Sequence, residues 1–472
     1  MTKAASTGGR WSRQPIDRRS RRTATTLIVG SFPVVLGTTT LTVALHDVAV
    51  DFGAHIGMSQ WVVTGYLAAL CLVVPMAAWL QRQLGARRLW CAGLTAFALG
   101  SVLCAVSWDP VSLIAARMIQ GLGGGVTMPL LTTILMQVAP ERDRLRLASV
   151  VGLVTGLAPI AGPVLGGVVV GVIGWRWLFW MNLPLGAVGL SLALRLVERD
   201  RPQAGGRLDL LGMVMLPPAL LGLLWGLSRA PDAGQWGDAE VLAPLTAGGV
   251  LLLAFVGWSL HRRERSLVEV RVLGNHATWA ATLMLLLASV VLHGGLVLLP
   301  LMWQQLQQTS ALQAGLLLVP HGMGALASRF AALRLMAARG PRVVSMTGFG
   351  LAALGTMPFA VVDPGSADWV LLVVLVVRGL GIGMVIVPLM TVAFDGLEQS
   401  QIPHASVVIR ISQQLGGALG VTMLVAILTT TSATGSVPPG FHTAFSWMAA
   451  VAGGAMALSV VLPGPGRRQP NA

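Results

Sequence analysis

Fourteen apolar runs, each close in length to a membrane-spanning helix, follow one another along the chain between short polar connectors. A helix needs about 20 apolar residues to cross a hydrocarbon layer about 30 Å thick. The pattern therefore predicts an all-α polytopic membrane protein with fourteen spans. The runs cover roughly residues 25–47, 57–80, 89–107, 110–136, 147–171, 178–197, 210–229, 241–260, 277–303, 312–335, 342–362, 368–393, 405–429 and 440–462.

Basic residues are divided unevenly between the two sides of this predicted bundle. If the N-terminus is cytoplasmic, 26 Lys and Arg fall in cytoplasmic segments, and two, Arg176 and Arg229, fall in outer connectors. Cytoplasmic loops of membrane proteins carry such an excess. We therefore expect both termini in the cytoplasm and a multi-pass location in a bacterial plasma membrane.

Composition agrees with a membrane protein and argues against several other classes. Apolar residues make up 54% of the chain and charged residues only 11%, too few polar groups to cover a soluble protein of this size. The net charge of +14 lies in connectors rather than on a folded basic face, so no nucleic-acid partner is expected. No Walker loop, nucleophile–base set or metal-ligand spacing is present. We expect no enzyme activity, no cofactor and no metal.

The order of the runs predicts two six-helix halves with two extra helices between them. An Arg beside a glycine cluster marks both the fourth run, at Arg117, and the twelfth, at Arg378. Parallel six-helix repeats are typical of one large class of transporters. The predicted segments are a basic arm at 1–24, an N-terminal half at 25–197, a linker with two inserted spans at 198–276, a C-terminal half at 277–462 and a tail at 463–472.

Two segments resemble sequence motifs of a known family. The fourth run contains Arg117-Met-Ile-Gln120-Gly121, and the fifth contains Gly162-Pro163-Val-Leu-Gly166-Gly167. Together they resemble the R-x-x-Q-G motif and the antiporter motif of the drug:proton antiporter family with fourteen spans, in the major facilitator superfamily. The resemblance implies a multidrug efflux permease that exports amphipathic small molecules, including antibiotics, by proton antiport.

The antiporter motif also has a physical interpretation of its own. Its small residues recur at helical spacing, which allows another backbone to approach closely, and Pro163 removes an amide and bends the helix. We expect this face to seal one end of a central cavity while two halves rock against each other. The motif residues are Gly152, Gly156, Gly162, Pro163, Gly166 and Gly167.

The chain departs from the family where an acidic residue is expected in the first span. Gly37 stands at that position, Thr42 replaces an Asn, and Arg82 replaces the Asp of the loop after the second span. No Asp or Glu lies deep in any predicted span. His293 and His321 are the deepest groups that titrate near neutral pH, and we expect them to take part in proton coupling.

Other candidate residues follow from charge and depth. A buried Arg must face the protein interior or water, and Gln120 lies on the same helix face as Arg117. We assign transport or coupling roles to Arg117, Gln120, His293, His321, Arg378 and Arg410, and weaker cavity-lining roles to Thr38, Thr42 and Trp180. A structural clamp is the alternative role for Arg117.

Three functions remain open at this point. The first is a monomeric secondary exporter of amphipathic compounds that exchanges them for protons across the lipid bilayer. The second is an exporter of an endogenous natural product or lipid with weak or no proton coupling, which the missing acid favours. The third is a non-transporting sensor or scaffold built on a degenerate transporter fold, which the intact antiporter motif argues against.

Overall fold

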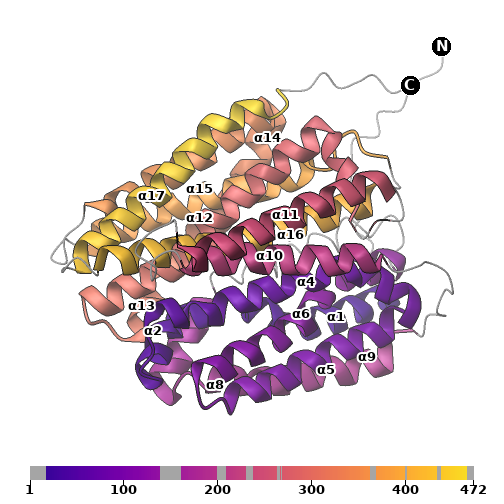
Figure 1. Cartoon of the computed structure of the whole chain (residues 1–472), viewed down its shortest axis with the longest axis horizontal. Coiled ribbons are helices and arrows are strands. Elements are labelled where there is room, and N and C mark those ends of the chain that lie inside the picture. The colour runs from indigo at the N-terminus through magenta and orange to yellow at the C-terminus, as the bar shows by residue number, and fades with distance from the viewer. Residues whose placement is uncertain are drawn as a thin grey trace.

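Long helices running in alternating directions form the computed structural model, which describes residues 17–138, 161–198, 209–229, 238–262, 266, 268–361, 368–398, 401–432 and 437–464 (Figure 1). The regular elements within these ranges are all helical. The longer helices are α1 (Arg18–Leu36), α2 (Leu41–Asp51), α4 (Trp61–Leu84), α5 (Ala86–Ala105), α6 (Pro110–Val138), α9 (Asn182–Leu196), α10 (Leu210–Arg229), α11 (Ala239–Arg262), α12 (His276–Leu306), α14 (Val319–Leu354), α15 (Asp368–Val392), α16 (Ile402–Ser432) and α17 (Val437–Leu458). The shorter ones are α3 (Ile56–Ser59), α8 (Trp177–Trp180), η2 (Val270–Gly274), α13 (Ala311–Leu317), η3 (Met357–Ala360) and η4 (Ser459–Val461).

Twelve of the described helical segments are long and apolar enough to cross a membrane, and α1 with α2 forms one further bent span. The helix Ala161–Ile173 is apolar but shorter. It stands where the fifth span is predicted, at 147–171, and most of that range lies outside the described residues. The all-α polytopic membrane fold is therefore confirmed, and the total of fourteen spans stays a prediction.

The helix ends gather at two opposite ends of the bundle. α1, the first described helix, begins at the end of the bundle where α9 and α17 end; we call this the termini end (Figure 1). α8, α13 and the last turn of α2 lie at the opposite end, which we call the distal end. A termini end that holds both the first and the last described helix agrees with an even number of spans.

The first predicted span, 25–47, is broken rather than continuous. α1 and α2 meet at 45° around residues 37–40. The Thr38 hydroxyl donates to the Val35 carbonyl at 2.6 Å, and the Thr42 hydroxyl donates to Thr39 at 2.7 Å. Such back-bonding by hydroxyls bends helices, and Pro33 has already removed one amide from α1. The break leaves the Gly37 carbonyl free for another partner.

The two halves repeat each other, and their glycines show the register. A Cβ on Gly123 of α6 would meet Phe97 N at 2.4 Å and Gly93 O at 2.6 Å, whereas one on Gly381 of α15 would meet Ala352 N at 2.4 Å and Gly348 O at 2.5 Å. Both glycines therefore allow the same close crossing of neighbouring helices. This crossing supports the predicted six-helix repeat, and it makes Gly123 the equivalent of Gly381.

α14 is interrupted by a kink at Gly340, which has non-helical dihedral angles. This kink matches the loop at Gly85 that follows α4. Gly85 and Gly340 both adopt a positive φ, of 81° and 79°, which favours glycine. Two residues later, Arg87 donates to the Leu194 carbonyl and Arg342 donates to the Leu462 carbonyl. Each arginine thus binds a backbone carbonyl at the C-terminal end of the last helix in its own half, where a cation is favoured.

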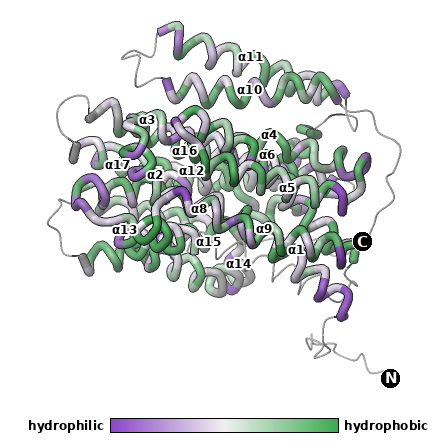
Figure 2. Tube along the Cα trace, turned by 90° about the horizontal axis from the view of Figure 1, so that it is seen from below, coloured by the Kyte–Doolittle hydropathy of each residue, from purple (hydrophilic) through white to green (hydrophobic). Residues whose placement is uncertain are grey.

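The two inserted helices lie along one side of the bundle. α10 and α11 form a separate pair beyond α16 and α4 (Figure 2). At the start of α10, Asp209 Oδ1 accepts from the Gly212 amide at 3.1 Å and from Trp258 Nε1 of α11 at 2.8 Å. The Asp209 carboxylate therefore caps the N-terminus of α10 and also links α10 to α11.

Candidate functional site

A tight seam closes the distal end between the two halves. A Cβ on Gly167 would stand 2.6 Å from the Ala311 carbonyl oxygen, and one on Gly315 of α13 would stand 2.4 Å from the Pro163 carbonyl oxygen. The two backbones therefore touch at positions where neither helix tolerates a side chain. Nearby, the Gln304 side-chain amide of α12 donates to the Val43 carbonyl of α2 at 2.8 Å. We call these contacts the distal seam.

The antiporter helix uses a second face to pack within its own half. A Cβ on Gly162 would meet Thr39 Oγ1 at 1.9 Å, and one on Gly166 would meet the Thr40 carbonyl at 2.4 Å. The same helix thus packs against the α1–α2 break with one face and against α13 with the other. Gly152 and Gly156 lie outside the described residues.

An ion pair fixes the end of this helix to α2. Arg176 Nη1 donates to Asp51 Oδ2 at 2.7 Å, and Trp175 Nε1 donates to the same oxygen at 3.3 Å. The Arg176 guanidinium also lies over the Trp175 ring, 4.3 Å from its centroid. The sequence Gly174-Trp175-Arg176 therefore anchors the antiporter motif at the distal end.

Arg117 is buried among three helices and is satisfied by uncharged groups. Its Nε donates to the Val62 carbonyl at 3.0 Å, its Nη2 donates to the Gly37 carbonyl at 3.0 Å, and its Nη1 donates to Gln120 Oε1. The guanidinium also lies 3.9 Å from the centroid of the Tyr66 ring. Gln120 Nε2 in turn donates to Ser101 Oγ at 2.6 Å. This geometry fits the clamp alternative, since it joins α6 to α4, α5 and the α1–α2 break.

Arg378 is the equivalent of Gln120 rather than of Arg117. A Cβ on Gly100 would stand 2.5 Å from Gln120 N, and a Cβ on Gly355 would stand 2.5 Å from Arg378 N. The register suggested by the two Arg–Gly clusters is therefore three residues off. The position equivalent to Arg117 is Leu375, so the second half has no arginine clamp at this position.

Arg378 and His321 form a buried pair with unused nitrogen atoms. Arg378 Nη2 donates to the Val291 carbonyl of α12 at 2.6 Å, and its Nη1 lies 3.5 Å from His321 Nδ1. Arg378 Nε and His321 Nε2 are both buried without a hydrogen-bond partner in the described structure. Buried polar atoms of this kind are uncommon. Arg378 Nε can still donate a hydrogen bond, and His321 Nε2 can still donate or accept one.

The two candidate histidines face opposite sides of α12. Gly295 faces Arg378, since a Cβ there would meet Nη2 at 1.9 Å. His293, two residues earlier and so about 200° around the helix, instead packs against Gly417 of α16, with Nδ1 3.0 Å from a Cβ at that glycine. His321 belongs to the Arg378 side. The structure does not bring the two histidines together.

His293 belongs to a polar face between the halves. Arg410, Gln414 and Gly417 recur at spacings of four and three on α16, so they share one face, and Gly417 borders both His293 and Leu67 of α4. His293, Arg410 and Gln414 are each half-buried although α16 packs against α4, α10, α12 and α17. We call His293, Arg410 and Gln414 the midline face. Sequence reasoning missed Gln414, which the spacing to Arg410 could have revealed.

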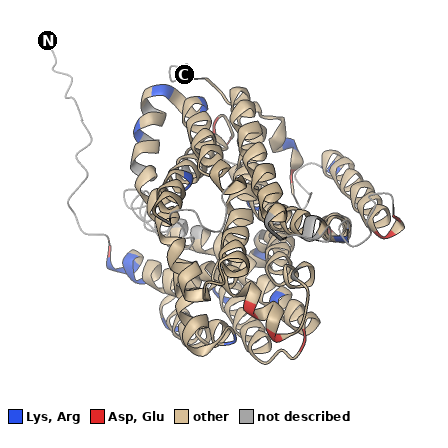
Figure 3. Ribbon diagram, turned by 90° about the vertical axis from the view of Figure 1, so that its left-hand side faces the viewer, with Lys and Arg blue, Asp and Glu red and all other residues tan. Residues whose placement is uncertain are grey.

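Charged residues are otherwise sparse among the helices, as the view from the distal end shows (Figure 3). The weaker cavity candidates lie elsewhere. Thr38 and Thr42 sit at the α1–α2 break, and Trp180 is 36% exposed on α8, beside α5 and α9. Within the described residues, no group of three or more His, Cys, Asp or Glu could hold a metal ion.

Comparison with known proteins agrees with this architecture. Residues 27–421 match the Major Facilitator Superfamily. The chain is 36% identical to a Mycobacterium tuberculosis protein named multidrug resistance protein B homolog, over 86% of this chain and 76% of that protein. It is 34% identical to the cephamycin export protein CmcT of Amycolatopsis lactamdurans, over 86% and 85% of the two chains.

A third relative, the lincomycin resistance protein LmrB of Listeria monocytogenes, is 26% identical over 85% of each chain. The family match, at residues 27–421, covers most of the chain. The proteins of this superfamily are transporters rather than enzymes. The chain belongs to the major facilitator superfamily, in its drug-efflux branch.

Proposed function

We propose that this protein exports amphipathic small molecules, drugs and antibiotics among them, from the bacterial cytoplasm by exchanging them for protons. The names of its relatives support drug or antibiotic export. The distal seam supports alternating access, because the two halves can move apart there as rigid bodies and break the backbone contacts between them. We further propose that both termini are cytoplasmic, so that the distal end faces outward, and that the protein acts as a monomer.

The observation that carries proton coupling is the Arg378–His321 pair. A proton on His321 would place two positive charges about 3.5 Å apart in a medium where charges interact strongly. Proton uptake therefore requires Arg378 and His321 to separate or an anion to join them. Because α12 holds Arg378 through the Val291 carbonyl, movement of α12 would change the proton affinity of His321. This links protonation to the conformational cycle.

The interior charge also bears on the cargo. The predicted spans contain no deep Asp or Glu, while the midline face presents Arg410 and His293. A cationic drug would meet the like charge of Arg410 and no carboxylate on this face, whereas a neutral or anionic drug would meet no like charge. We propose that neutral and anionic amphiphiles are exported in preference to cations. An anthracycline-type cation and a carboxylate dye of similar size would distinguish these cargoes.

Accumulation of a fluorescent cargo in a pump-deficient host tests the function. We expect the wild-type protein to lower accumulation, an uncoupler to restore it, and His321→Gln to behave like the uncoupler. His276→Gln is the matched control, since His276 is an exposed residue at the start of α12. Efflux that ignores both the uncoupler and His321→Gln would favour the second function, export of an endogenous natural product or lipid with weak or no proton coupling.

A further inference from the structure

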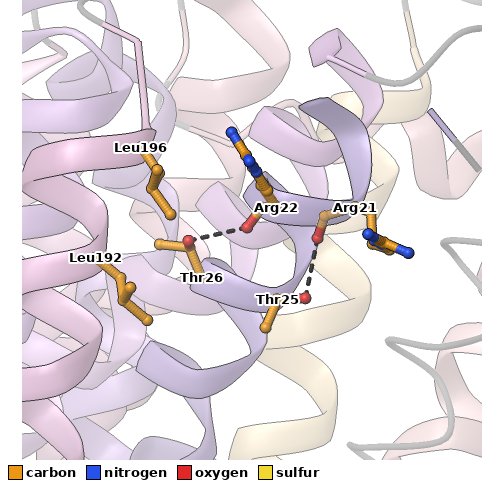
Figure 4. Close-up of a pocket in the computed structure, with 6 residues that line it drawn as sticks. All are labelled: Arg21, Arg22, Thr25, Thr26, Leu192 and Leu196. Atoms are coloured by element: carbon orange, nitrogen blue, oxygen red, sulfur yellow. Dashed lines mark hydrogen bonds between the residues drawn. The ribbon is translucent and has the colours of Figure 1, made fainter. Parts of the chain in front are cut away.

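A crevice of about 200 Å³ opens between α1 and α9 at the termini end, far from the distal seam (Figure 4). The two helices touch where a Cβ on Gly189 would meet Gly30 Cα at 2.5 Å, and the crevice lies about two turns closer to the termini end. Its lining residues are Arg21, Arg22, Thr25, Thr26, Leu192 and Leu196. The volume equals roughly six or seven water molecules, enough for a group of the size of a phosphate.

The crevice combines positive charge with an apolar wall. The Arg22 side chain extends on the side of Leu196, whereas Arg21 turns to the other side of α1 (Figure 4). Leu196 is 38% exposed, so the apolar wall of the crevice faces the surroundings of the helix bundle. In a membrane, this wall contacts lipid.

Nearby acidic groups are already occupied. Glu198 pairs with Arg19, and Asp17 caps α1 by accepting from the Arg19 and Ser20 amides at 3.1 and 3.3 Å. Within the described residues, neither Arg21 nor Arg22 has a carboxylate partner. The Arg19, Ser20 and Arg21 amides at the start of α1 already donate to Asp17, so an anion here would depend on the arginine side chains.

The hydroxyls of the crevice add a further constraint. Thr25 Oγ1 donates to the Arg21 carbonyl at 3.0 Å, and Thr26 Oγ1 donates to the Arg22 carbonyl at 2.9 Å. With their protons engaged, these oxygens can only accept. Thr26 is only 1% exposed, whereas Thr25 is exposed, so the Thr25 oxygen suits a ligand that carries a hydroxyl donor as well as negative charge.

We infer that this crevice binds the headgroup of an anionic phospholipid, with phosphatidylglycerol as the best match. The phosphodiester lies beside Arg22, a glycerol hydroxyl donates to Thr25 Oγ1, and an acyl chain runs along Leu192 and Leu196. Basic pockets between helices at a membrane surface bind anionic headgroups on these terms. The site is independent of the transport pathway proposed above.

Native mass spectrometry of the full chain tests this site, with equimolar phosphatidylglycerol and phosphatidylcholine offered together. We expect retained phosphatidylglycerol to exceed phosphatidylcholine, and Arg22→Gln to lower its affinity about fivefold. Leu196→Glu should do the same by supplying Arg22 with a carboxylate. Arg339→Gln, an exposed arginine on α14, is the matched control and should change nothing.

Two results would overturn the inference. One is equal retention of the two lipids, or an equal loss in Arg339→Gln, because either would mean that the binding is not at this crevice. The other is displacement of the lipid by inorganic phosphate or by soluble glycerophosphoglycerol at matched concentration. That would identify a site for free phosphate groups that makes no use of the leucine wall.

Discussion

Adding one methyl group at Gly167 should shift the equilibrium of the transporter from the state with the distal seam closed toward the state with the seam open. In the structure, a Cβ there would stand 2.6 Å from the Ala311 carbonyl oxygen and 3.1 Å from Leu312 Cα. Both neighbours are backbone atoms, so they cannot turn aside as a flexible side chain would. The distal seam must therefore open for Gly167→Ala to be accommodated.

The expected size of the effect follows from the cost of overpacking. Extra methyl groups in tightly packed regions cost about 1–3 kcal/mol. If that cost applies only when the seam is closed, the ratio of closed to open states falls by a factor of about 5 to 150. Export should slow because the closed state becomes rare, while membrane insertion should be unaffected.

Spin labels on either side of the seam measure this ratio directly. Val50 at the end of α2 and Leu316 on α13 are 68% and 50% exposed, so labels there disturb little packing. Cys71, Cys91 and Cys104 would first be replaced by alanine. Pulsed electron spin measurements should show the longer separation gaining population in Gly167→Ala.

Gly186→Ala is the control for this experiment. Gly186 also lies in a helix, but a Cβ there would have no atom within 4 Å. An unchanged distance distribution in Gly167→Ala would show that packing at Gly167 does not control the ratio of closed to open states. So would an equal shift in Gly186→Ala, since the effect would then not come from the distal seam.

Three further predictions concern other parts of the molecule. Arg117→Met should lower the thermal stability of the purified protein, by about 1–3 kcal/mol for a carbonyl such as that of Gly37 left unpaired; an unchanged melting temperature would contradict the clamp role. Arg410→Glu should shift cargo preference toward cations in the accumulation assay, and an unchanged ratio of cationic to anionic cargo would remove Arg410 from the cargo path. Reporter fusions after Asp232 should read extracytoplasmic and those after Arg265 cytoplasmic. A cytoplasmic signal at Asp232 would mean that α10 and α11 do not cross the membrane as an inserted pair.

Hydropathy and charge placement predicted the membrane fold because they depend only on local composition. Each described span begins and ends within several residues of its apolar run. The break in the first span was not predicted, although its causes are local. Pro33 and three consecutive threonines, Thr38 to Thr40, were visible, but an apolar run does not distinguish a straight helix from two helices at 45°.

Contacts between helices were harder to predict, because they depend on how helices are rotated about their axes. Arg117 and Arg378 look equivalent in the sequence, yet the glycine contacts align Arg378 with Gln120. A shift of three residues keeps both arginines on nearly the same helix face, so sequence periodicity cannot detect it. The same limit applies to His293 and His321, whose similar depth says nothing about the side of α12 that each one faces.

The sequence did predict that the antiporter glycines permit close backbone contact, and Gly167 and Gly315 support this. The sequence could not predict which helix packs against these glycines. A small-residue face predicts that something packs closely, while α13 as the partner follows only from the folded chain.

The most direct test of the central claim is transport by the purified protein in liposomes with an imposed pH gradient and a pH-sensitive dye inside. We predict that a gradient drives uphill movement of cargo, that cargo movement in turn produces proton flux in the opposite direction, and that His321→Gln abolishes both while cargo still binds. Downhill cargo movement with no proton flux, identical in the wild type and His321→Gln, would contradict it.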